Sequence, residues 1–436
     1  MLFSLDVVRA RKGDCLLLHY GSKNKPRLVV IDGGPKTVYA QHLKPRLQQV
    51  KKAHGQIRKA QGLEPDKPLV VDLLMVSHVD DDHIQGILNF TRDLIQDDPQ
   101  FAQILSFWHN SFENVIGANL PAEVTASFTH QFGPASMNGE PPDDMTLDVD
   151  EDEEVIVSSL KVLASVQQGA QLRSDIVSNL KADLNVDFTG GLIVAKEGTE
   201  PIELEDNLVF TVAGPMLGEL EELHKKHQEW LEKLHEAGKS AEDVLSAYMD
   251  KSVPNLSSIV LLAECDGKTI LLTGDARGDK ILKGLELAGL LEQGGKLEVD
   301  VVKVPHHGSS NNIAENFFER VVASHYVFSG NGEHGNPERE TLEMLLNTRG
   351  DEDYVIHFTY PVNEIDEGRK ADWEKEQNKQ KKKQEKKPET IVRADWSHEE
   401  NSLDALFNKH PSFAKKLSIV EDGAPHVIDL LEEVEF

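Results

Sequence analysis

The segment with the clearest chemical potential is the hexad HVDDDH at residues 78–83. All of its residues except Val79 are acids or histidines. Core packing cannot explain such a cluster, because buried charge is costly unless it is paired or bound to a metal ion. In a tight loop the first and third residues project to one side, and the fifth and sixth face a neighbouring point. The spacing therefore predicts ligands for two metal ions a few ångströms apart, as in two-metal hydrolysis. The competing interpretation is an acidic surface loop with two chance histidines.

Two elements would hold the hexad in place. The preceding run VVDLLMVSH, residues 70–78, is almost continuously apolar and has the length of a strand buried on both faces. The following run IQGILNFTRDLIQ, residues 84–96, has apolar residues at helical spacing. We therefore expect the hexad in a loop from a buried strand to a helix. Further strand patterns occur at 2–8, 15–20, 27–34, 257–265, 268–275, 299–308, 325–331, 354–360 and 426–431, with a helical stretch at 42–60.

The hexad also resembles a known motif. SHVDDDH is similar to the H-x-[HD]-x-D-H signature of the metallo-β-lactamase superfamily, and aspartate at its second position resembles the soluble nuclease-like domain of the ComEC competence protein family. Further segments resemble that branch in order and spacing: VIDGG with Asp32, FWHN with His109, LLTGD with Asp275, VKVPHHGSS with His306 and His307, and GEHGNP with His334. These motifs span most of the chain.

The resemblance implies a ligand set for two divalent ions, zinc or manganese. One ion would be held by His78, Asp80 and His109, the other by Asp82, His83 and a later histidine, with Asp275 between them. Either His306 or His307 would be a ligand, while the other orients the substrate or donates a proton to the leaving group. We favour His306 as the ligand and His307 as the catalytic group. His334 would be a further ligand.

The same resemblance implies how catalysis would proceed. The ions would activate a water molecule for attack, without a serine or cysteine nucleophile. Asp82 or Asp275 could accept a proton during the attack. Aspartate at position 80 replaces a histidine nitrogen by a carboxylate oxygen, which is a harder ligand. This change moves the preference of the first metal site from zinc toward manganese.

Several polar residues near the motifs have expected supporting roles. Asp32 and Asn110 would fix the orientation of ligands. Ser309, Ser310 and Asn311 follow the histidine pair in a turn and could hydrogen-bond a phosphate or carboxylate. We therefore expect these last three residues to bind the substrate.

The resemblance implies an α/β fold of four layers, the αβ/βα metallo-β-lactamase sandwich, with two facing sheets, helices outside and the metal ions at one sheet edge. Residues 1–365 would form the hydrolase domain. A mainly helical insertion at about 110–240 would contain an acidic loop at about 140–155, and its helical segment between about 150 and 240 would shield the metal edge. Residues 366–388 would be a charged linker or exposed helix, and residues 389–436 a small C-terminal extension.

Composition limits the location and the partners. The 436 residues carry a formal net charge of -29, which repels a long polyanion and weakens the case for tight nonspecific DNA binding. The chain has no run of about 18 apolar residues that would predict a membrane-spanning helix, and no secretory leader is evident. Cys15 and Cys265 lie in apolar strand patterns and are expected to be reduced. We therefore expect a cytoplasmic protein without membrane contact.

Three functional hypotheses follow. The first is a metal-dependent phosphodiesterase or nuclease-like enzyme that acts on a nucleic acid or nucleotide, which the Asp80 variant and the HHGS motif favour. The second is an acyl hydrolase acting on an ester, lactone, thioester or peptide, because the same metal site supports this chemistry on the same fold. The third is a partner-dependent effector or interaction module of a multi-protein bacterial system such as phage defence, with a partner protein bound through the acidic insertion.

Overall fold

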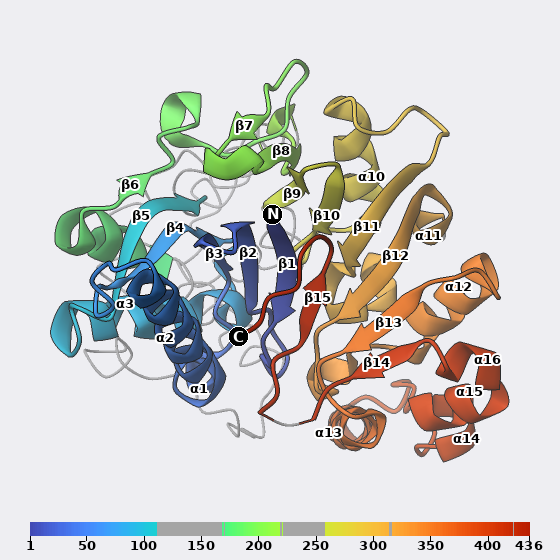
Figure 1. Ribbon diagram of the computed structural model, residues 1–436. Coiled ribbons are helices and arrows are strands. Elements are labelled where there is room, and N and C mark those ends of the chain that lie inside the picture. The colour runs from blue at the N-terminus through green and yellow to red at the C-terminus, as the bar shows by residue number, and fades with distance from the viewer. Residues whose placement is uncertain (111–167, 170, 219, 221–257, 314–315, 422) are drawn as a thin grey trace, which may run out of the picture.

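The computed structural model describes residues 1–110, 168–169, 171–218, 220, 258–313, 316–421 and 423–436. In this part of the chain, two mixed β-sheets pack against each other and helices lie on their outer faces (Figure 1). Three apolar clusters fill the spaces between these layers: one between the sheets, and one between each sheet and its helices. The expected α/β class is confirmed.

The first sheet has seven strands in the order β15-β1-β2-β3-β4-β5-β6. Their bounds are Leu2–Val7 (β1), Leu16–Ser22 (β2), Lys25–Ile31 (β3), Leu69–Val76 (β4), Ala102–His109 (β5), Asp183–Leu184 (β6) and Val427–Asp429 (β15). Strands β15, β1, β2 and β3 pair antiparallel, whereas β3 to β6 run parallel. Parallel β4 and β5 therefore end at the same edge, where Val76 pairs with His109.

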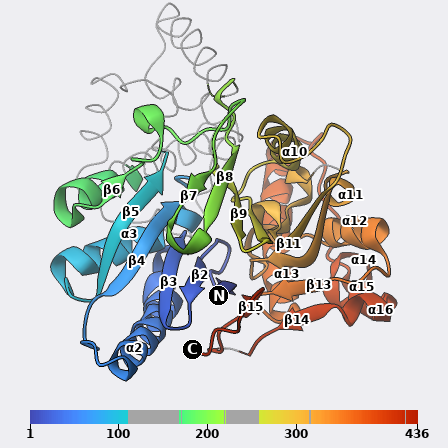
Figure 2. The ribbon, with the colours of Figure 1, turned by 45° about the horizontal axis from the view of Figure 1, so that its top comes forward.

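The second sheet has eight strands in the order β14-β13-β12-β11-β10-β9-β8-β7, seen beside the first sheet in Figure 2. Their bounds are Ile202–Glu203 (β7), Val209–Gly214 (β8), Val260–Cys265 (β9), Lys268–Leu272 (β10), Leu297–Lys303 (β11), Val321–Phe328 (β12), Val355–Phe358 (β13) and Leu417–Ile419 (β14). Strands β7 to β10 pair antiparallel, and β10 to β14 run parallel. The parallel strands β10 and β11 thus also end at one edge.

The helices cover the sheets because each presents an apolar face to them. On the first sheet lie α1 (Lys36–Val38), α2 (Lys44–Ala60) and α3 (Asp81–Gln96), and on the second α10 (Gly278–Leu287), α11 (Phe317–Arg320) and α12 (Arg339–Arg349). In α3 the buried residues Ile84, Ile87 and Leu94 recur at helical spacing, as the sequence predicts. The expected strand at 70–78 and helix at 84–96 are confirmed as β4 and α3.

The C-terminal part of the chain is built into both sheets. Residues 366–386, expected as a charged linker or exposed helix, lie in α13 (Val362–Lys386), which buries Ile365, Arg369 and Gln377. After α14 (His398–Asn401), α15 (Leu403–Lys409) and α16 (Pro411–Ala414), β14 extends the second sheet and β15 pairs with β1 in the first. The expected C-terminal extension therefore does not stand apart, because its backbone completes the hydrogen-bond ladders of two edge strands.

The expected insertion at 110–240 is only partly described. Its described residues include the short strands β6 and β7, the sheet strand β8, and short helical segments, of which Asp175–Leu180 buries Asp175 and Ile176. The acidic loop at 140–155 and most of the segment expected to shield the metal edge lie outside the described residues. Cys15 and Cys265 are free thiols and both are buried. Among the described helices, none is long and apolar enough to span a membrane.

Candidate metal centre

The hexad occupies the loop from β4 to α3, with Asp80 as the residue before the helix and Asp82 in its first turn. Acidic residues suit this position, because the N-terminus of a helix carries partial positive charge. The turn is held tightly against the loop after β3: the Gly33 N–H donates to the His83 carbonyl over 2.8 Å. A side chain on Gly86 would lie 1.9 Å from the Gly33 carbonyl oxygen, so only glycine permits this approach.

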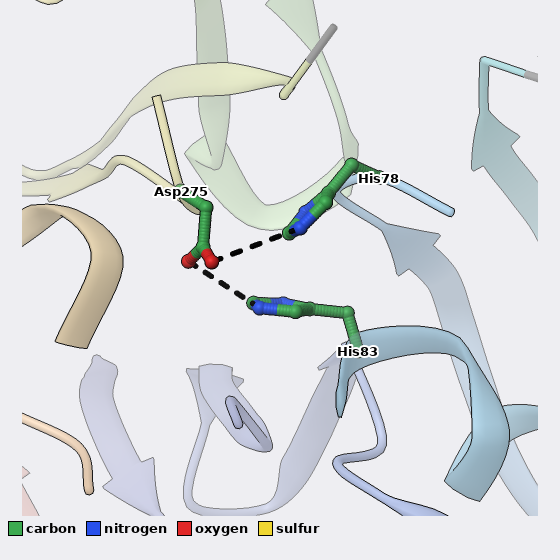
Figure 3. Close-up of side chains that lie close together, drawn as sticks. All are labelled: His78, His83 and Asp275. Carbon is green, nitrogen blue, oxygen red and sulfur yellow. Dashed lines mark ion pairs between the residues drawn. The ribbon is translucent and has the colours of Figure 1, made fainter. Parts of the chain in front are cut away.

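Asp275, in the turn that follows β10 and three residues after the strand ends, faces the hexad from the second sheet. Its Oδ2 atom lies 3.8 Å from His78 Nε2, and its Oδ1 atom lies 3.3 Å from His83 Nε2 (Figure 3). The three side chains point toward one another although two follow β4 of the first sheet and one follows β10 of the second (Figure 3). All three are almost completely buried.

The histidine pair after β11 approaches Asp275 from its other side. His307 is buried, and its Nε2 lies 3.4 Å from Asp275 Oδ1. His306 is more exposed, with 28% of its side chain accessible, and its Nε2 lies 3.6 Å from Asp275 Oδ2. Both histidines have positive φ angles, 47° and 53°. Side chains other than glycine adopt this conformation at a cost, and such strain concentrates at functional sites.

These residues form overlapping groups of metal-binding atoms. Each of the following triplets brings one ligand atom per residue within 4.8 Å of the others: His78–His83–Asp275, Asp82–His83–His307, Asp14–Asp275–His307, Asp14–Asp32–His83 and His78–Asp80–Asp82. The structure thus brings together all four candidate ligands of the hexad with Asp275 and His307. Asp14 belongs to two of the triplets although the sequence motifs did not include it.

Four buried atoms at the centre have no hydrogen-bond partner: His78 Nε2, His83 Nε2, Asp275 Oδ1 and His307 Nε2. The other ring nitrogen of each histidine faces an oxygen. His78 Nδ1 lies 3.0 Å from Ser77 Oγ, His83 Nδ1 lies 2.8 Å from an Asp32 carboxylate oxygen, and His307 Nδ1 lies 3.1 Å from Ser329 Oγ. Proton donation at Nδ1 leaves the Nε2 lone pair directed inward in all three rings, as metal ligation requires.

The carboxylate behind His83 has the expected supporting role. Asp32 accepts hydrogen bonds from the Ser77 backbone N–H and the Ser77 hydroxyl, each over 2.7 Å. It adopts a positive φ of 56° in the turn after β3. Asn110, for which the same role was expected, is instead hydrogen-bonded to the Ile193 backbone over 2.7 and 2.9 Å. Its described bonds thus fix a neighbouring loop.

A second buried carboxylate lies behind His307 and was missed from the sequence. Asp14, in the turn before β2, accepts a hydrogen bond from Ser329 and lies 3.3 Å from His307 Nδ1. It forms an ion pair with Lys303, which is also buried. A lysine inside the apolar run VDVVKV was the one signal that could have drawn attention to this pair, since lysine is almost never fully buried without a partner.

Mutual attraction shifts the pKa values of these groups. Burial opposes the charged form of His307, but Asp275 and Asp14 raise its pKa to about 9. Burial likewise opposes protonation of His83, yet Asp275 and Asp32 hold its pKa well above the ordinary value. Burial raises the pKa of Asp275, but the surrounding histidines outweigh it and hold that pKa well below the usual range. The carboxylate is therefore in its ligand form at neutral pH.

Besides His306, which is favoured above as a ligand but belongs to none of these groups, two expected metal ligands lie outside them. His109, at the end of β5, is buried near His78, and burial lowers its pKa to about 4. Among the described residues, it belongs to no group of three metal-binding side chains. His334 is exposed and, within the same described part of the chain, also belongs to none. The hexad and Asp275 therefore define the centre more clearly than these two histidines do.

The three residues expected to bind substrate differ in their environments. Ser309 is buried, and its N–H donates to the His306 carbonyl over 2.9 Å. The Ser310 hydroxyl donates to Glu338, so it is engaged within the protein. Asn311 is exposed beside the histidine pair. Of the three, Asn311 has the side chain most accessible to a ligand.

Sequence comparisons add little to this geometry. No protein-family model matches the chain. Over 110 residues, 25% of this chain, it is 32% identical to microtubule-associated protein 1A of Rattus norvegicus and to that of Homo sapiens. The matched stretch spans 4% of the length of these relatives. This similarity over a quarter of the chain assigns it to no family.

Proposed function

We propose that the chain is a metal-dependent hydrolase with the metallo-β-lactamase fold, which holds two divalent ions at this centre and favours phosphodiester substrates. The observation that carries the proposal is the set of four buried, unpartnered atoms that converge around Asp275. Buried polar atoms are almost always satisfied, so several of them pointing at one space require a ligand. Imidazole and carboxylate groups together suit zinc or manganese.

The geometry of Asp275 supports two ions. Its Oδ2 atom faces His78 and His306, whereas its Oδ1 atom faces His83 and His307. One ion would then be held on the side of His78, Asp80 and Asp275 Oδ2, and the other on the side of Asp82, His83, His307 and Asp275 Oδ1. In this assignment His307 is the buried ligand, and the more exposed His306 is available to the substrate.

The charge of the centre also supports two ions. Five carboxylates gather there, those of Asp14, Asp32, Asp80, Asp82 and Asp275, and among the described residues the one ammonium in contact with them is that of Lys303. With neutral histidines, as metal ligation requires, five carboxylates against one ammonium leave an excess of four negative charges. Two divalent cations would balance this excess, part of which protonation of His83 and His307 offsets in their absence.

The chain's own residues would carry out the proton transfers. When bound, the ions would polarise the substrate and lower the pKa of a water molecule. Asp82, a half-buried residue in the first turn of α3, is placed to accept a proton from the attacking water. His306 lies at the partly exposed edge of the centre and is placed to donate a proton to the leaving group. His83 and His307, held by Asp32 and Asp14, would keep the ligand geometry rigid.

Preference for a phosphodiester rests on the resemblance of the Asp80-containing hexad and the HHGSS turn to the nuclease-like branch. A bound pair of cations reverses the local sign of the potential, so an anionic substrate is compatible with the acidic chain. The net charge of -29 favours a short substrate over a long polyanion. Packing of two sheets with helices on the outside supports the fold part of the proposal.

The test is hydrolysis of bis(p-nitrophenyl) phosphate and of p-nitrophenyl acetate with added manganese or zinc. The wild type should cleave the phosphodiester, and Asp82→Ala should lower kcat/KM at least about 100-fold. Asp81→Ala is the matched control, because Asp81 lies in the same turn but in none of the described metal-binding triplets. Hydrolysis of the acetate alone by the metal-loaded wild type would contradict the phosphodiesterase assignment. Equal activity of Asp82→Ala and wild type would contradict a catalytic centre here.

A further inference from the structure

The buried ion pair of Lys303 and Asp14 stands directly behind the centre but contains none of the ligands proposed above. Lys303 ends β11 and is 1% exposed. Its ammonium pairs with Asp14 Oδ2, donates to the Gly274 carbonyl over 3.1 Å and lies 3.7 Å from Asp275 Oδ1. The Lys303 ammonium thus contacts two carboxylates, those of Asp14 and Asp275, and the backbone carbonyl of the residue before Asp275.

The other oxygen of Asp14 faces His307. Asp14 Oδ1 lies 3.3 Å from His307 Nδ1 and accepts a hydrogen bond from Ser329, whose hydroxyl lies 3.1 Å from the same ring nitrogen. A carboxylate in this place keeps the proton on Nδ1 and turns Nε2 toward Asp275. The two oxygens of Asp14 therefore have separate tasks: one is anchored to Lys303, and the other orients the ring.

The two histidines that face Asp275 Oδ1 differ in this respect. Behind His83, Asp32 is held by the neutral N–H and hydroxyl groups of Ser77. Behind His307, Asp14 is held by a full positive charge. A carboxylate with a charged partner is oriented more firmly, because charge-assisted hydrogen bonds are about twice as strong as neutral ones. The ammonium also offsets the negative charge that would otherwise accumulate beside Asp275.

We propose that Asp14 and Lys303 form a positioning pair that sets the orientation of His307 and thereby the metal affinity of one side of the centre. The inference rests on the proposed function in that His307 must be a ligand. Neither residue is required to touch the substrate or the ions. Asp14 acts through His307, and Lys303 acts through Asp14 and Asp275.

The test is calorimetric titration of metal-free protein with zinc. The wild type should bind two ions per chain. Asp14→Asn should weaken one of them about 10- to 100-fold, the usual effect of losing a carboxylate behind a histidine ligand, and leave the other within about threefold. Asp32→Asn is the matched variant behind His83, the other histidine assigned to the same ion. It should weaken that same ion and leave the one beside His78 and Asp80 within about threefold.

The Asp14→Asn substitution is also tested in a protein that already lacks the His307 ring. This double variant distinguishes positioning of His307 from a general structural role of Asp14. If Asp14 acts through His307, Asp14→Asn should have no further effect on zinc affinity in a His307→Ala protein, since effects of coupled residues are not additive. An undiminished effect of Asp14→Asn in that background would overturn the proposal. So would a folded Asp14→Asn protein that binds both ions with wild-type affinity.

Milder variants keep the test decisive if Asp14→Asn fails to fold. Lys303→Arg preserves the charge and should retain both affinities within about fivefold, whereas Lys303→Met should weaken the same ion as Asp14→Asn. Ser329→Ala should weaken that ion by about two- to fivefold. Equal zinc binding by Lys303→Met and wild type would overturn the proposal. A wild type that binds no zinc or manganese would instead overturn the proposed function, so the two failures are distinguishable.

Discussion

At the residue scale, adjacent histidines meet the centre in different ways. His307 is buried and presents Nε2 to Asp275 Oδ1, whereas His306 remains partly exposed beside Asp275 Oδ2. Two successive positive φ angles turn the chain so sharply that consecutive side chains reach opposite oxygens of one carboxylate. Asp275 is thus the residue that all four histidine contacts share, and its removal should affect both sides of the centre.

We predict that Asp275→Asn releases both metal ions together. An amide is neutral and offers one oxygen in place of two, so zinc affinity should fall at least about 100-fold on each side. Zinc per chain, measured by mass spectrometry after gel filtration, should drop from two to near zero. Asp279→Asn, at an exposed position paired with Arg277, should retain full zinc content. Retention of one ion with wild-type affinity by Asp275→Asn would contradict a shared role.

At the element scale, the ends of three parallel-sheet strands deliver the centre. The hexad follows β4, Asp275 follows β10 and His307 follows β11. Close backbone contacts lock these loops together. A side chain on Gly13 would lie 1.8 Å from the Asp82 carbonyl oxygen, which shows how tightly the turn before β2 abuts the start of α3.

We predict that Gly13→Ala disturbs stability and metal binding at once. The added methyl group must displace the Asp82 backbone, and overpacking of this kind costs about 1–3 kcal/mol in the free energy of unfolding. Urea denaturation should show this loss, and zinc titration should show weaker binding. Gly218→Ala is the control, because no atom of the described residues lies within 4 Å of its added methyl group. Unchanged zinc affinity in a destabilised Gly13→Ala protein would separate this turn from the centre.

Helix α13 is attached to the segment that follows it through one buried arginine. Its sequence is rich in charge, yet Arg369 is buried, donates to Asp366 over 3.0 Å and to the Asn401 carbonyl over 2.8 Å, and stacks over Trp396. This one side chain connects the helix to the segment that follows it.

We predict that Arg369→Ala lowers the free energy of unfolding by about 3 kcal/mol, the effect of breaking a buried ion pair. The neighbouring exposed Lys370 lies 3.9 Å from Glu374, and Lys370→Ala should change stability by less than about 0.5 kcal/mol. Urea unfolding of the two variants provides the measurement. Similar values for both would mean that α13 is not anchored through Arg369.

At the scale of the whole molecule, a chain of three histidines links the two sheets. His325 on β12 and His357 on β13 lie 2.9 Å apart through their ring nitrogens, and His357 lies 2.9 Å from His426. The His426 carbonyl in turn accepts from the N–H of Val7 at the end of β1. Each contact needs one donor and one acceptor nitrogen, which three neutral rings can supply.

Burial and the adjacent histidines lower the pKa of His357 to about 2, and burial lowers the pKa of His426 to about 4. Burial also lowers the pKa of His325. The charged groups facing the ends of the chain are Asp300 and Lys268 near His325, and Asp6 and Arg9 near His426. The unfolded chain takes up protons below about pH 6.5 that the folded chain does not. Stability is therefore fully present above that pH and is lost as the pH falls toward the folded pKa values.

We predict that His357→Gln reduces this acid sensitivity. Glutamine can hydrogen-bond but does not titrate, so the loss of unfolding free energy between pH 6.5 and 4.5 should be smaller than in wild type by about 2 kcal/mol. Urea denaturation at the two pH values measures the difference. His398→Gln, at an exposed position, should follow the wild type. The same acid sensitivity in His357→Gln as in wild type would rule out the histidine chain as its source.

Much of the architecture follows from local patterns in the sequence. Apolar runs and helical spacing predicted β4, α3 and most strands, because each pattern reflects burial within one element. The hexad was likewise identifiable, since clustered acids and histidines have no packing role at strand ends, whereas Asp275 was found through the resemblance of LLTGD to a family motif. The same resemblance favoured His306 as a ligand and included His109 and His334, whose surroundings depend on how loops turn after their strands.

Two features could be read from the tertiary structure alone: the residues that contact the outer nitrogens of the histidine ligands, and the strands that the C-terminal segment adds to the two sheets. Asp14 meets Ser329 across 315 positions of sequence, and Lys303 reaches Asp14 from the other sheet. β14 and β15 belong to different sheets although a short segment separates them. A sequence pattern records the periodicity of one element, whereas such contacts depend on how two sheets pack and in what register their strands align.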